Sequence, residues 1–226
     1  MSSPDLTVIY FTASAGNKDF ETEIRRTLLE TIQPLNLPLI SVSQKPLDFG
    51  ENICVGDVGV SSSNGFRQLQ IGANAAKTKF VCIAESDYLY PRQYFEFIPD
   101  REDTFYVAVP TWLFDVRTNV AQRVFRRKPQ GDAGAMIVGR DTLIGRIQAI
   151  LGSQSTWSDA TLTRRQSAFL LRKSQINCTV FDVGVPIVTF KTDGQLHVKH
   201  PVVFRSKCTE LPYWGSAESL ARRYAV

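Results

Sequence analysis

The chain has 226 residues, 43% of them hydrophobic, and its 26 basic residues against 22 acidic ones give a net charge of +4. This length is enough for a sizeable core in one large domain or two small ones. The mild positive charge permits an anionic ligand such as a nucleotide or a nucleic acid without requiring one.

Cysteine use and hydropathy exclude further classes. The four cysteines form no C-x-x-C pair, which argues against a zinc ribbon. No apolar run reaches the ~18 residues of a membrane span, and no basic-then-apolar signal opens the sequence. We therefore expect a cytoplasmic protein with no membrane span.

The first elements predict half of a nucleotide-binding α/β unit. Residues 6–11 are β-branched and aromatic, which is typical of a buried strand. A small, polar loop follows over 12–17, and then a helix whose apolar residues recur every four positions until Pro34 ends it. The loop carries neither G-x-G-x-x-G nor G-x-x-x-x-G-K-[ST], so we expect neither the dinucleotide fingerprint nor a P-loop.

The next elements lead to a central strand. Residues 39–43 predict a second short strand, and residues 47–63 read as a long loop of the kind that is usually functional. Residues 64–77 predict a helix with small residues on one side, which would let it pack closely on a sheet. The apolar run at 80–84 predicts a buried strand directly after it.

The second half alternates strands and helices. We expect a short helix after Pro91, strands at 104–110, 135–139, 178–183 and 186–190, helices at 143–151 and 160–173, and a last helix after Trp214. This order favours an α/β fold in one domain over residues 1–226. Its central sheet would be mixed, mostly parallel in the N-terminal half, and flanked by helices.

Two acids, Glu85 and Asp87, end the strand at 80–84. A buried strand that delivers acids at its carboxyl end places hard oxygen ligands where open α/β sheets bind ligands. Such ligands suit Mg²⁺ or Mn²⁺. We expect Asp87 to hold a metal on a diphosphate, with Glu85 acting through water. The alternative is that both acids cap the following turn.

The chain has only two histidines, His197 and His200, and both lie in a polar, basic tail segment. A neutral imidazole can bind Mn²⁺, so His200 is the second candidate ligand; the alternative is an exposed histidine without a role. Among the basic residues, Arg67 is the best placed for a diphosphate, because it lies near the start of the helix before the metal strand.

Two basic groups either form solvated surface or meet an acidic or nucleic-acid acceptor. They comprise Arg117, Arg123, Arg126, Arg127 and Lys128 in one stretch, and Arg164, Arg165, Arg172 and Lys173 in another.

Transfer to a hydroxyl needs a carboxylate that removes its proton. Asp159 follows Trp157 at the start of an expected helix, where it reads equally well as an N-cap. Asp132, in a flexible loop, and Asp115 are the competitors.

Several stretches, in chain order, resemble glycosyltransferases of the GT-A fold, similar to family-2-like enzymes of bacteria and phages. They are residues 12–29, I-S-V-S-Q-K-P over 40–46, the helix 64–77, A-E-S-D-Y-L-Y-P over 84–91, L-H-V-K-H over 196–200 and P-Y-W-G-S over 212–216. The resemblance covers most of the chain, and the middle, 111–175, matches only loosely.

This resemblance implies a single Rossmann-like GT-A domain with a nucleotide-sugar donor, such as a UDP-sugar, and Mn²⁺ or Mg²⁺. Residues 1–110 would form the donor half, and residues 111–226 the acceptor half with the metal-binding histidine tail. The family's D-x-D motif stands here as Glu85-Ser86-Asp87, which leaves Asp87 and His200 as the metal ligands. The implied donor-binding residues are Thr12, Ser14, Ser41, Gln44, Arg67, Gln68, Glu85 and Ser86.

The implied reaction is an inverting, single-displacement hexosyl transfer with Asp159 or Asp132 as the catalytic base. Two acceptors stay open. One is a hydroxymethylated base in phage DNA, which would have to leave the base stack and would place the protein in the host cytoplasm. The other is a cell-surface glycan or a lipid-linked acceptor.

Two other classes compete with this one. A nucleotidyltransferase shares the early topology, but the loop at 12–16 has one glycine and no arginine. A non-catalytic nucleic-acid- or sugar-binding module on a transferase fold is the second, and the presence of both Asp87 and His200 argues against it. Neither the sugar nor the oligomeric state can be read from the sequence.

Overall fold

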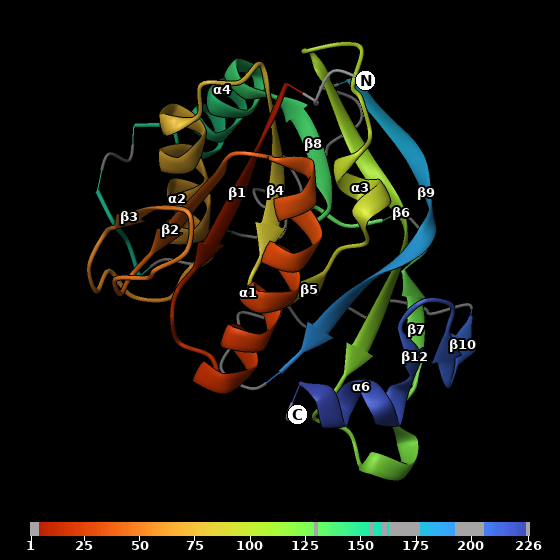
Figure 1. The fold of residues 1–226 in the computed structure, drawn as a ribbon. Coiled ribbons are helices and arrows are strands. Elements are labelled where there is room, and N and C mark those ends of the chain that lie inside the picture. The colour runs from red at the N-terminus through yellow and green to blue at the C-terminus, as the bar shows by residue number, and fades with distance from the viewer. Residues whose placement is uncertain are drawn as a thin grey trace.

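The computed structural model describes residues 5–128, 131–153, 156–159, 162, 177–192 and 206–224. Its centre is a sheet of 10 strands in the order β10-β7-β6-β8-β4-β1-β2-β3, with β9 paired to β6 and to the short β5. Figure 1 shows this sheet with helices on both faces. The predicted mixed α/β fold is confirmed.

The N-terminal half of the sheet is parallel. β1 (Leu6–Thr12) lies between β2 (Leu39–Ser43) and β4 (Phe80–Glu85), and β3 (Glu51–Cys54) extends the sheet beyond β2. All residues of β1 except Phe11 are buried, as its β-branched and aromatic sequence predicted. The expectation that residues 47–63 form a loop was wrong in part, because β3 pairs with β2 inside that range.

The second half of the sheet is mixed. β8 (Met136–Gly139) runs antiparallel to β4 and to β6 (Thr104–Asp115), and β7 (Phe125–Lys128) runs antiparallel to the end of β6. β9 (Asn177–Lys191) runs parallel to β6 and antiparallel to β5 (Tyr88–Leu89). We expected two strands, at 178–183 and 186–190, where β9 is one; the continuous strand has an irregularity in its pairing opposite 109–111.

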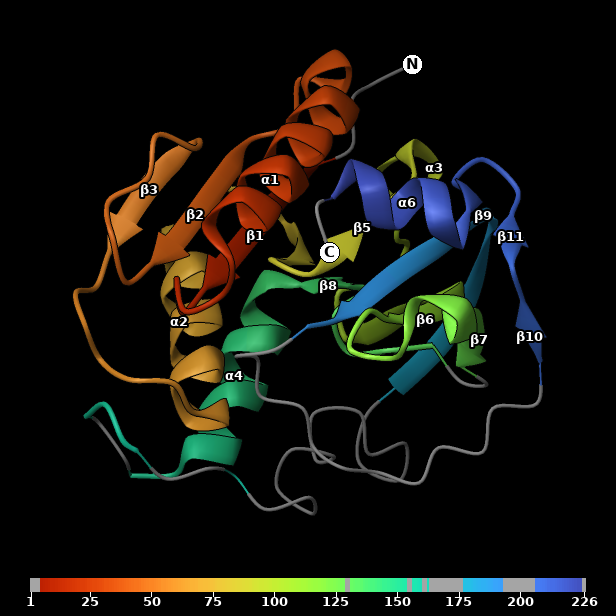
Figure 2. The same ribbon diagram turned by 90° about the horizontal axis from the view of Figure 1, so that it is seen from below.

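The helices cover opposite faces of the sheet. α1 (Lys18–Ile32) packs on one face, and α2 (Ser62–Ala75) and α4 (Arg140–Leu151) pack on the other, as Figure 2 shows. The small residues predicted on one side of α2 do allow close packing: a Cβ added at Gly72 would lie only 2.5 Å from Cγ2 of Ile9 in β1.

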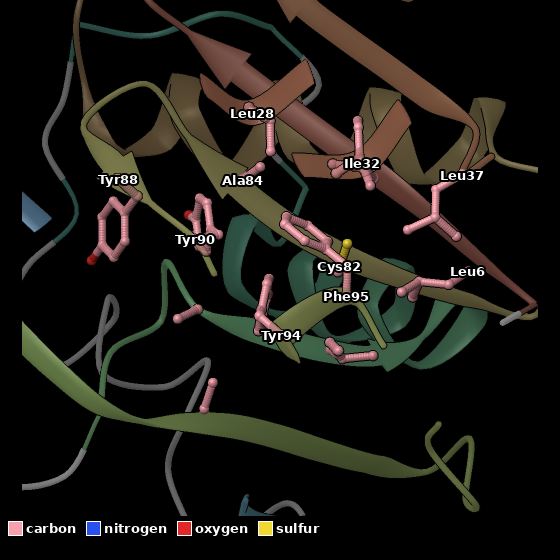
Figure 3. Packing of buried hydrophobic residues seen from close by; sticks show 14 of the residues in the cluster. Leu6, Leu28, Ile32, Leu37, Cys82, Ala84, Tyr88, Tyr90, Tyr94 and Phe95 are labelled. Carbon is pink, nitrogen blue, oxygen red and sulfur yellow. The ribbon is translucent and has the colours of Figure 1, made fainter. Parts of the chain in front are cut away.

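The core beneath α1 combines aliphatic and aromatic side chains. Leu28 and Ile32 of α1 pack over Cys82 and Ala84 of β4, and tyrosines from 88–94 continue the cluster toward β8 (Figure 3). The thiol of Cys82 is fully buried, in agreement with a core role.

The remaining elements are short. They are η1 (Gln33–Leu35), α3 (Arg92–Phe95), η2 (Val120–Gln122), β10 (Lys207–Cys208), β11 (Glu210–Leu211), β12 (Gly215–Ser216) and α6 (Ala217–Arg223). The predicted helix at 160–173 lies outside the described residues, apart from Leu162. Within the described part of the chain, no helix has the length and apolar character needed to cross a membrane.

Candidate active site

The carboxyl ends of three parallel strands meet at one edge of the sheet. In the register of the sheet, Thr12 of β1 pairs with Ser43 of β2, and Phe11 pairs with Glu85 of β4. The loops that leave these strands therefore start side by side. This is the edge at which open α/β sheets bind ligands.

Hydrogen bonds to the backbone of Glu85 and Asp87 fix the turn after β4. The backbone N–H of Glu85 donates to the Tyr90 hydroxyl (3.0 Å), which in turn donates to the Gly134 carbonyl (2.6 Å). On the other side, the Phe190 N–H donates to the Asp87 carbonyl (2.8 Å). Glu85 and Asp87 are thus held between β8 and β9, and both are only half-buried.

Both acids are harder to ionise than usual. Burial raises the pKa of Glu85, the neighbouring charge of Asp87 raises it further, and the Lys128 ammonium opposes the rise. Burial likewise raises the pKa of Asp87, against the opposing effect of Lys128. A nearby cation favours the ionised form of carboxyls whose pKa is raised in this way. The pair therefore fits a divalent metal, which prefers oxygen ligands.

In number, these two carboxylates fall short of the ligands that such a metal needs. Among the described residues, no group of three or more His, Cys, Asp and Glu side chains could hold a metal. His200, the predicted partner of Asp87, and His197 lie outside the described residues. A diphosphate could contribute further oxygens, as it does for Mg²⁺ in many nucleotide sites.

A third acid, Glu21, shapes the loop after β1. Its buried carboxylate accepts hydrogen bonds from the Thr12 hydroxyl (3.2 Å) and the Gly16 N–H (3.2 Å), and it pairs with Arg25 (3.5 Å). Sequence reasoning missed this role, because Glu21 looks like any acid in the first turn of a helix. Burial raises its pKa, and the Thr12 hydroxyl and Arg25 oppose the rise.

Ser14, which is predicted to bind the donor, lies in this loop with an unusual backbone conformation and a buried hydroxyl. Its backbone has a φ of 53°, in the left-handed region, and its N–H donates to the Thr12 hydroxyl (2.9 Å). Its own hydroxyl is buried and has no hydrogen-bond partner within the part of the chain that the structure describes. A polar group in this position can serve a ligand, because burial without a partner is costly.

Three other predicted donor-binding residues form hydrogen bonds with the backbone at this edge of the sheet. The Gln44 amide donates to the Gly59 carbonyl (2.8 Å) and accepts from the Val58 N–H (3.1 Å). The Gln68 amide of α2 donates to the Thr12 carbonyl (2.8 Å). The fully buried Ser41 hydroxyl donates to the Phe49 carbonyl, between β2 and β3 (2.7 Å). A donor-binding role for these side chains stays a prediction.

The segment 157–159, which contains Asp159, lies beside α2. The Arg67 guanidinium is 5.9 Å from the ring centroid of Trp157. Two hydrogen bonds, from the Ser61 hydroxyl to the Ser158 carbonyl (2.7 Å) and from the Ser158 N–H to Asn64 (2.9 Å), fix the 157–159 segment there. The Asp159 side chain is exposed, with one oxygen 3.2 Å from where a Cβ on Gly59 would stand.

The other two candidate bases are in ion pairs. Asp132 pairs with Lys128. Asp115 accepts two bonds from the Arg117 guanidinium (3.0 and 3.1 Å), and although burial acts to raise its pKa, Arg117 holds it below the usual value. A low pKa makes Asp115 a poor proton acceptor. The basic residues at 164, 165, 172 and 173 lie outside the described residues.

No family model matches the sequence, and no curated protein matches it. Among solved structures, the chain is similar to the inositol-1-phosphate CTP transferase from T. maritima, with a TM-score of 0.51 and 12% identity over 88% of this chain and 94% of that chain. At this identity the likeness establishes a shared fold.

Two glycosyltransferases also match. One is involved in the glycosylation of the major capsid of PBCV-1 (TM-score 0.47, 11% identity, 82% of this chain and 92% of that chain). The other is GalNAc-T7 with UDP, GalNAc and Mn²⁺ (TM-score 0.49, 9% identity, 84% of this chain and 44% of that chain).

Proposed function

We propose that the chain is a metal-dependent glycosyltransferase that moves a sugar from a nucleotide-sugar, such as a UDP-sugar, to an acceptor hydroxyl with inversion. One observation carries the proposal: Glu85 and Asp87 stand half-buried, with raised pKa values, at the sheet edge where the loops after β1, β2 and β4 converge. The family resemblance of this stretch supports the same assignment.

In this proposal, residues 1–110 form the donor half of a single domain. The loop at 12–17 receives the nucleoside, and the Ser14 hydroxyl, which has no partner among the described residues, serves as a hydrogen-bonding group. Arg67 then binds the diphosphate. Asp87 is the metal ligand, Glu85 supports it, and His200 completes the site from the tail. A bound Mn²⁺ or Mg²⁺ would neutralise charge on the leaving diphosphate.

Asp159 is the proposed base. Its carboxylate is exposed beside the loop that contains Gly59, so an acceptor hydroxyl could approach it from solvent. Asp132 is the weaker candidate because Lys128 already occupies its carboxylate. We expect Asp159→Asn to reduce kcat by about a hundredfold or more, as the loss of a general base does, with little effect on the KM of the donor.

The test is a panel of UDP-, GDP- and dTDP-sugars, with and without Mn²⁺, read out by thermal shift and by release of the nucleoside diphosphate. We expect one nucleotide class to stabilise the protein only with the metal, and Asp87→Ala to abolish this effect while the fold is kept. Failure of every nucleotide to stabilise the protein would overturn the proposal and favour a non-catalytic binding module.

The shared fold with a CTP transferase favours one other candidate, a nucleotidyltransferase. The loop at 12–16 argues against it, because it offers no arginine for a triphosphate. The products separate the two: a nucleotidyltransferase releases pyrophosphate from a nucleoside triphosphate, whereas a glycosyltransferase releases a nucleoside diphosphate from a nucleotide-sugar.

The acceptor is tested in the same assay with two classes of hydroxyl. One arm uses DNA with hydroxymethylated bases beside plain DNA, and the other uses cell-surface or lipid-linked glycans. Transfer to hydroxymethylated DNA alone would assign the DNA acceptor, and failure on every DNA would assign the glycan class.

A further inference from the structure

A lysine stands beside the two acids that the proposed metal would use. Lys128, the last residue of β7, forms an ion pair with Asp132, and only 20% of its side chain is exposed. Its ammonium lies 5.9 Å from the ring centroid of Tyr88, the residue that follows Asp87. An ammonium on a half-buried stem is thus fixed at the mouth of the site.

The turn before β8 brings this lysine and the acid pair together. A Cβ built on Gly134 would lie 2.7 Å from the Tyr88 hydroxyl and 2.9 Å from Oε1 of Glu85, so both side chains pack directly against this glycine. Asp132, which holds Lys128, is two residues earlier in the same turn, and the Asp132 carbonyl accepts a hydrogen bond from the Ala135 N–H (3.1 Å). Lys128 and Glu85 therefore both contact this short turn, Lys128 through Asp132 and Glu85 through Gly134.

The electrostatics agree with this placement. The Lys128 ammonium lowers the pKa of both Glu85 and Asp87, and burial lowers the pKa of Lys128 itself against the opposing effect of the two acids. Lys191 is a second lysine nearby, whose charge acts on Lys128 and on Asp115.

We propose that Lys128 is the resident counter-cation of the acid pair and competes with the divalent metal for it. The inference rests on the proposed function, because it assumes that Glu85 and Asp87 receive a metal. A fixed positive charge near a dication opposes its binding, and in a half-buried site water screens that repulsion only in part. Lys128 thereby sets how tightly the nucleotide-free protein holds the metal.

The experiment measures Mn²⁺ affinity directly, without donor or acceptor, by the electron paramagnetic resonance signal of free Mn²⁺. We expect Lys128→Met, which keeps most of the unbranched side chain and removes the ammonium, to bind Mn²⁺ about tenfold more tightly than the wild type or better. Because this variant leaves Asp132 unpaired, the double variant Lys128→Met/Asp132→Asn should show the same gain with the pair replaced as a unit.

Two controls separate local charge from net charge. Lys128→Arg keeps the charge and should bind Mn²⁺ within about twofold of the wild type. Lys191→Met makes the same change in net charge at the neighbouring lysine and should gain much less than Lys128→Met.

The outcomes are distinct. Equal Mn²⁺ affinity of the wild type and both Lys128→Met proteins, with thermal unfolding showing that they are folded, would overturn the role of Lys128 and leave the metal site of the proposed function intact. Binding by Lys128→Met but not by the wild type would support the inference in its strongest form. Absence of binding in every protein would overturn both the metal requirement and the inference.

Discussion

At the scale of single residues, the ionisation of Glu85 and Asp87 would govern the pH at which the proposed metal binds. Burial and the neighbouring charge of Asp87 raise the pKa of Glu85 to about 8, and burial raises the pKa of Asp87 to about 7, in both cases against the opposing charge of Lys128. Below this window the carboxyls hold protons that a metal must displace, whereas above it they are ionised.

The expected result is that Mn²⁺ binding strengthens as the pH rises from about 6 to about 9, and that binding near pH 7 releases protons. Titration calorimetry in two buffers of different ionisation enthalpy counts the protons released for each Mn²⁺ bound. A flat affinity across this range, with no proton release, would show that the acid pair is not the metal site.

Glu21 offers a second prediction about a single side chain. Glu21→Gln removes a charge-assisted partner of Thr12 and of the Gly16 N–H, so the loop at 12–17 loses its fixed shape. We expect the KM of the nucleotide donor to rise about tenfold, since such hydrogen bonds contribute about 1.5–3 kcal/mol, with a smaller change in kcat.

Steady-state kinetics and calorimetric titration with the nucleotide test this effect. The matched control is Glu23→Gln in the same helix, because Glu23 pairs on the surface with Arg26. This control should leave the KM within about twofold of the wild type, as surface ion pairs contribute little. An equal rise in KM for both variants would point to the helix as a whole and not to the loop contact.

Among the elements, the contact of α2 with β1 depends on one small residue. In Gly72→Ala the new methyl group would meet Cγ2 of Ile9 at 2.5 Å, and Ile9 is fully buried on a strand and cannot turn away. We expect this overpacking to lower the free energy of unfolding by about 1–3 kcal/mol.

Gly145 in α4 provides the control for Gly72. A Cβ there would meet nothing within 4 Å, so Gly145→Ala gains helix propensity without a clash and should raise the free energy of unfolding by up to about 1 kcal/mol. Urea unfolding of the two variants measures both values. Stabilisation by both substitutions would show that α2 can move away from the sheet at no cost.

Elements formed by a local sequence pattern could be predicted, whereas elements formed by contacts with distant segments could not. The strand at 80–84 and the helix α1 were predicted because the pattern lies within the element itself. β3 and the continuous β9 were not, because the neighbours β2 and β6 supply the hydrogen bonds that make them strands. The contacts of Glu21 with Thr12 and Gly16, and that of Lys128 with Tyr88, were not predicted either, because they depend on how the loops fold and not on a pattern within one element.

At the scale of the whole molecule, α6 joins the far end of the described chain to α1. Tyr224 is fully buried; its hydroxyl lies 2.9 Å from the Thr27 hydroxyl, and its ring packs against those of Phe20 and Phe190. We expect Tyr224→Ala to lower the free energy of unfolding by about 3–5 kcal/mol, whereas Tyr224→Phe loses only the hydrogen bond and about 0.5–1.5 kcal/mol.

Chemical denaturation followed by tryptophan fluorescence and circular dichroism compares the two Tyr224 variants. A similar small loss for both would mean that the aromatic contact between α6 and α1 contributes little to the stability of the fold. A large loss for Tyr224→Ala, with both probes changing together, would mean that the two ends of the sequence unfold as one unit.

The packing of Tyr224 on α1 also links the loop at 12–17 to a part of the chain that is distant in sequence. The Tyr224 ring packs against Phe20 of α1 and Phe190 of β9, and the next residue of α1, Glu21, accepts hydrogen bonds from Thr12 and Gly16 in the loop. A loss of packing at Tyr224 that loosens the start of α1 would therefore also loosen the loop. The Gly16 amide would then exchange its hydrogen with solvent faster in Tyr224→Ala than in the wild type, although the two residues are not in contact.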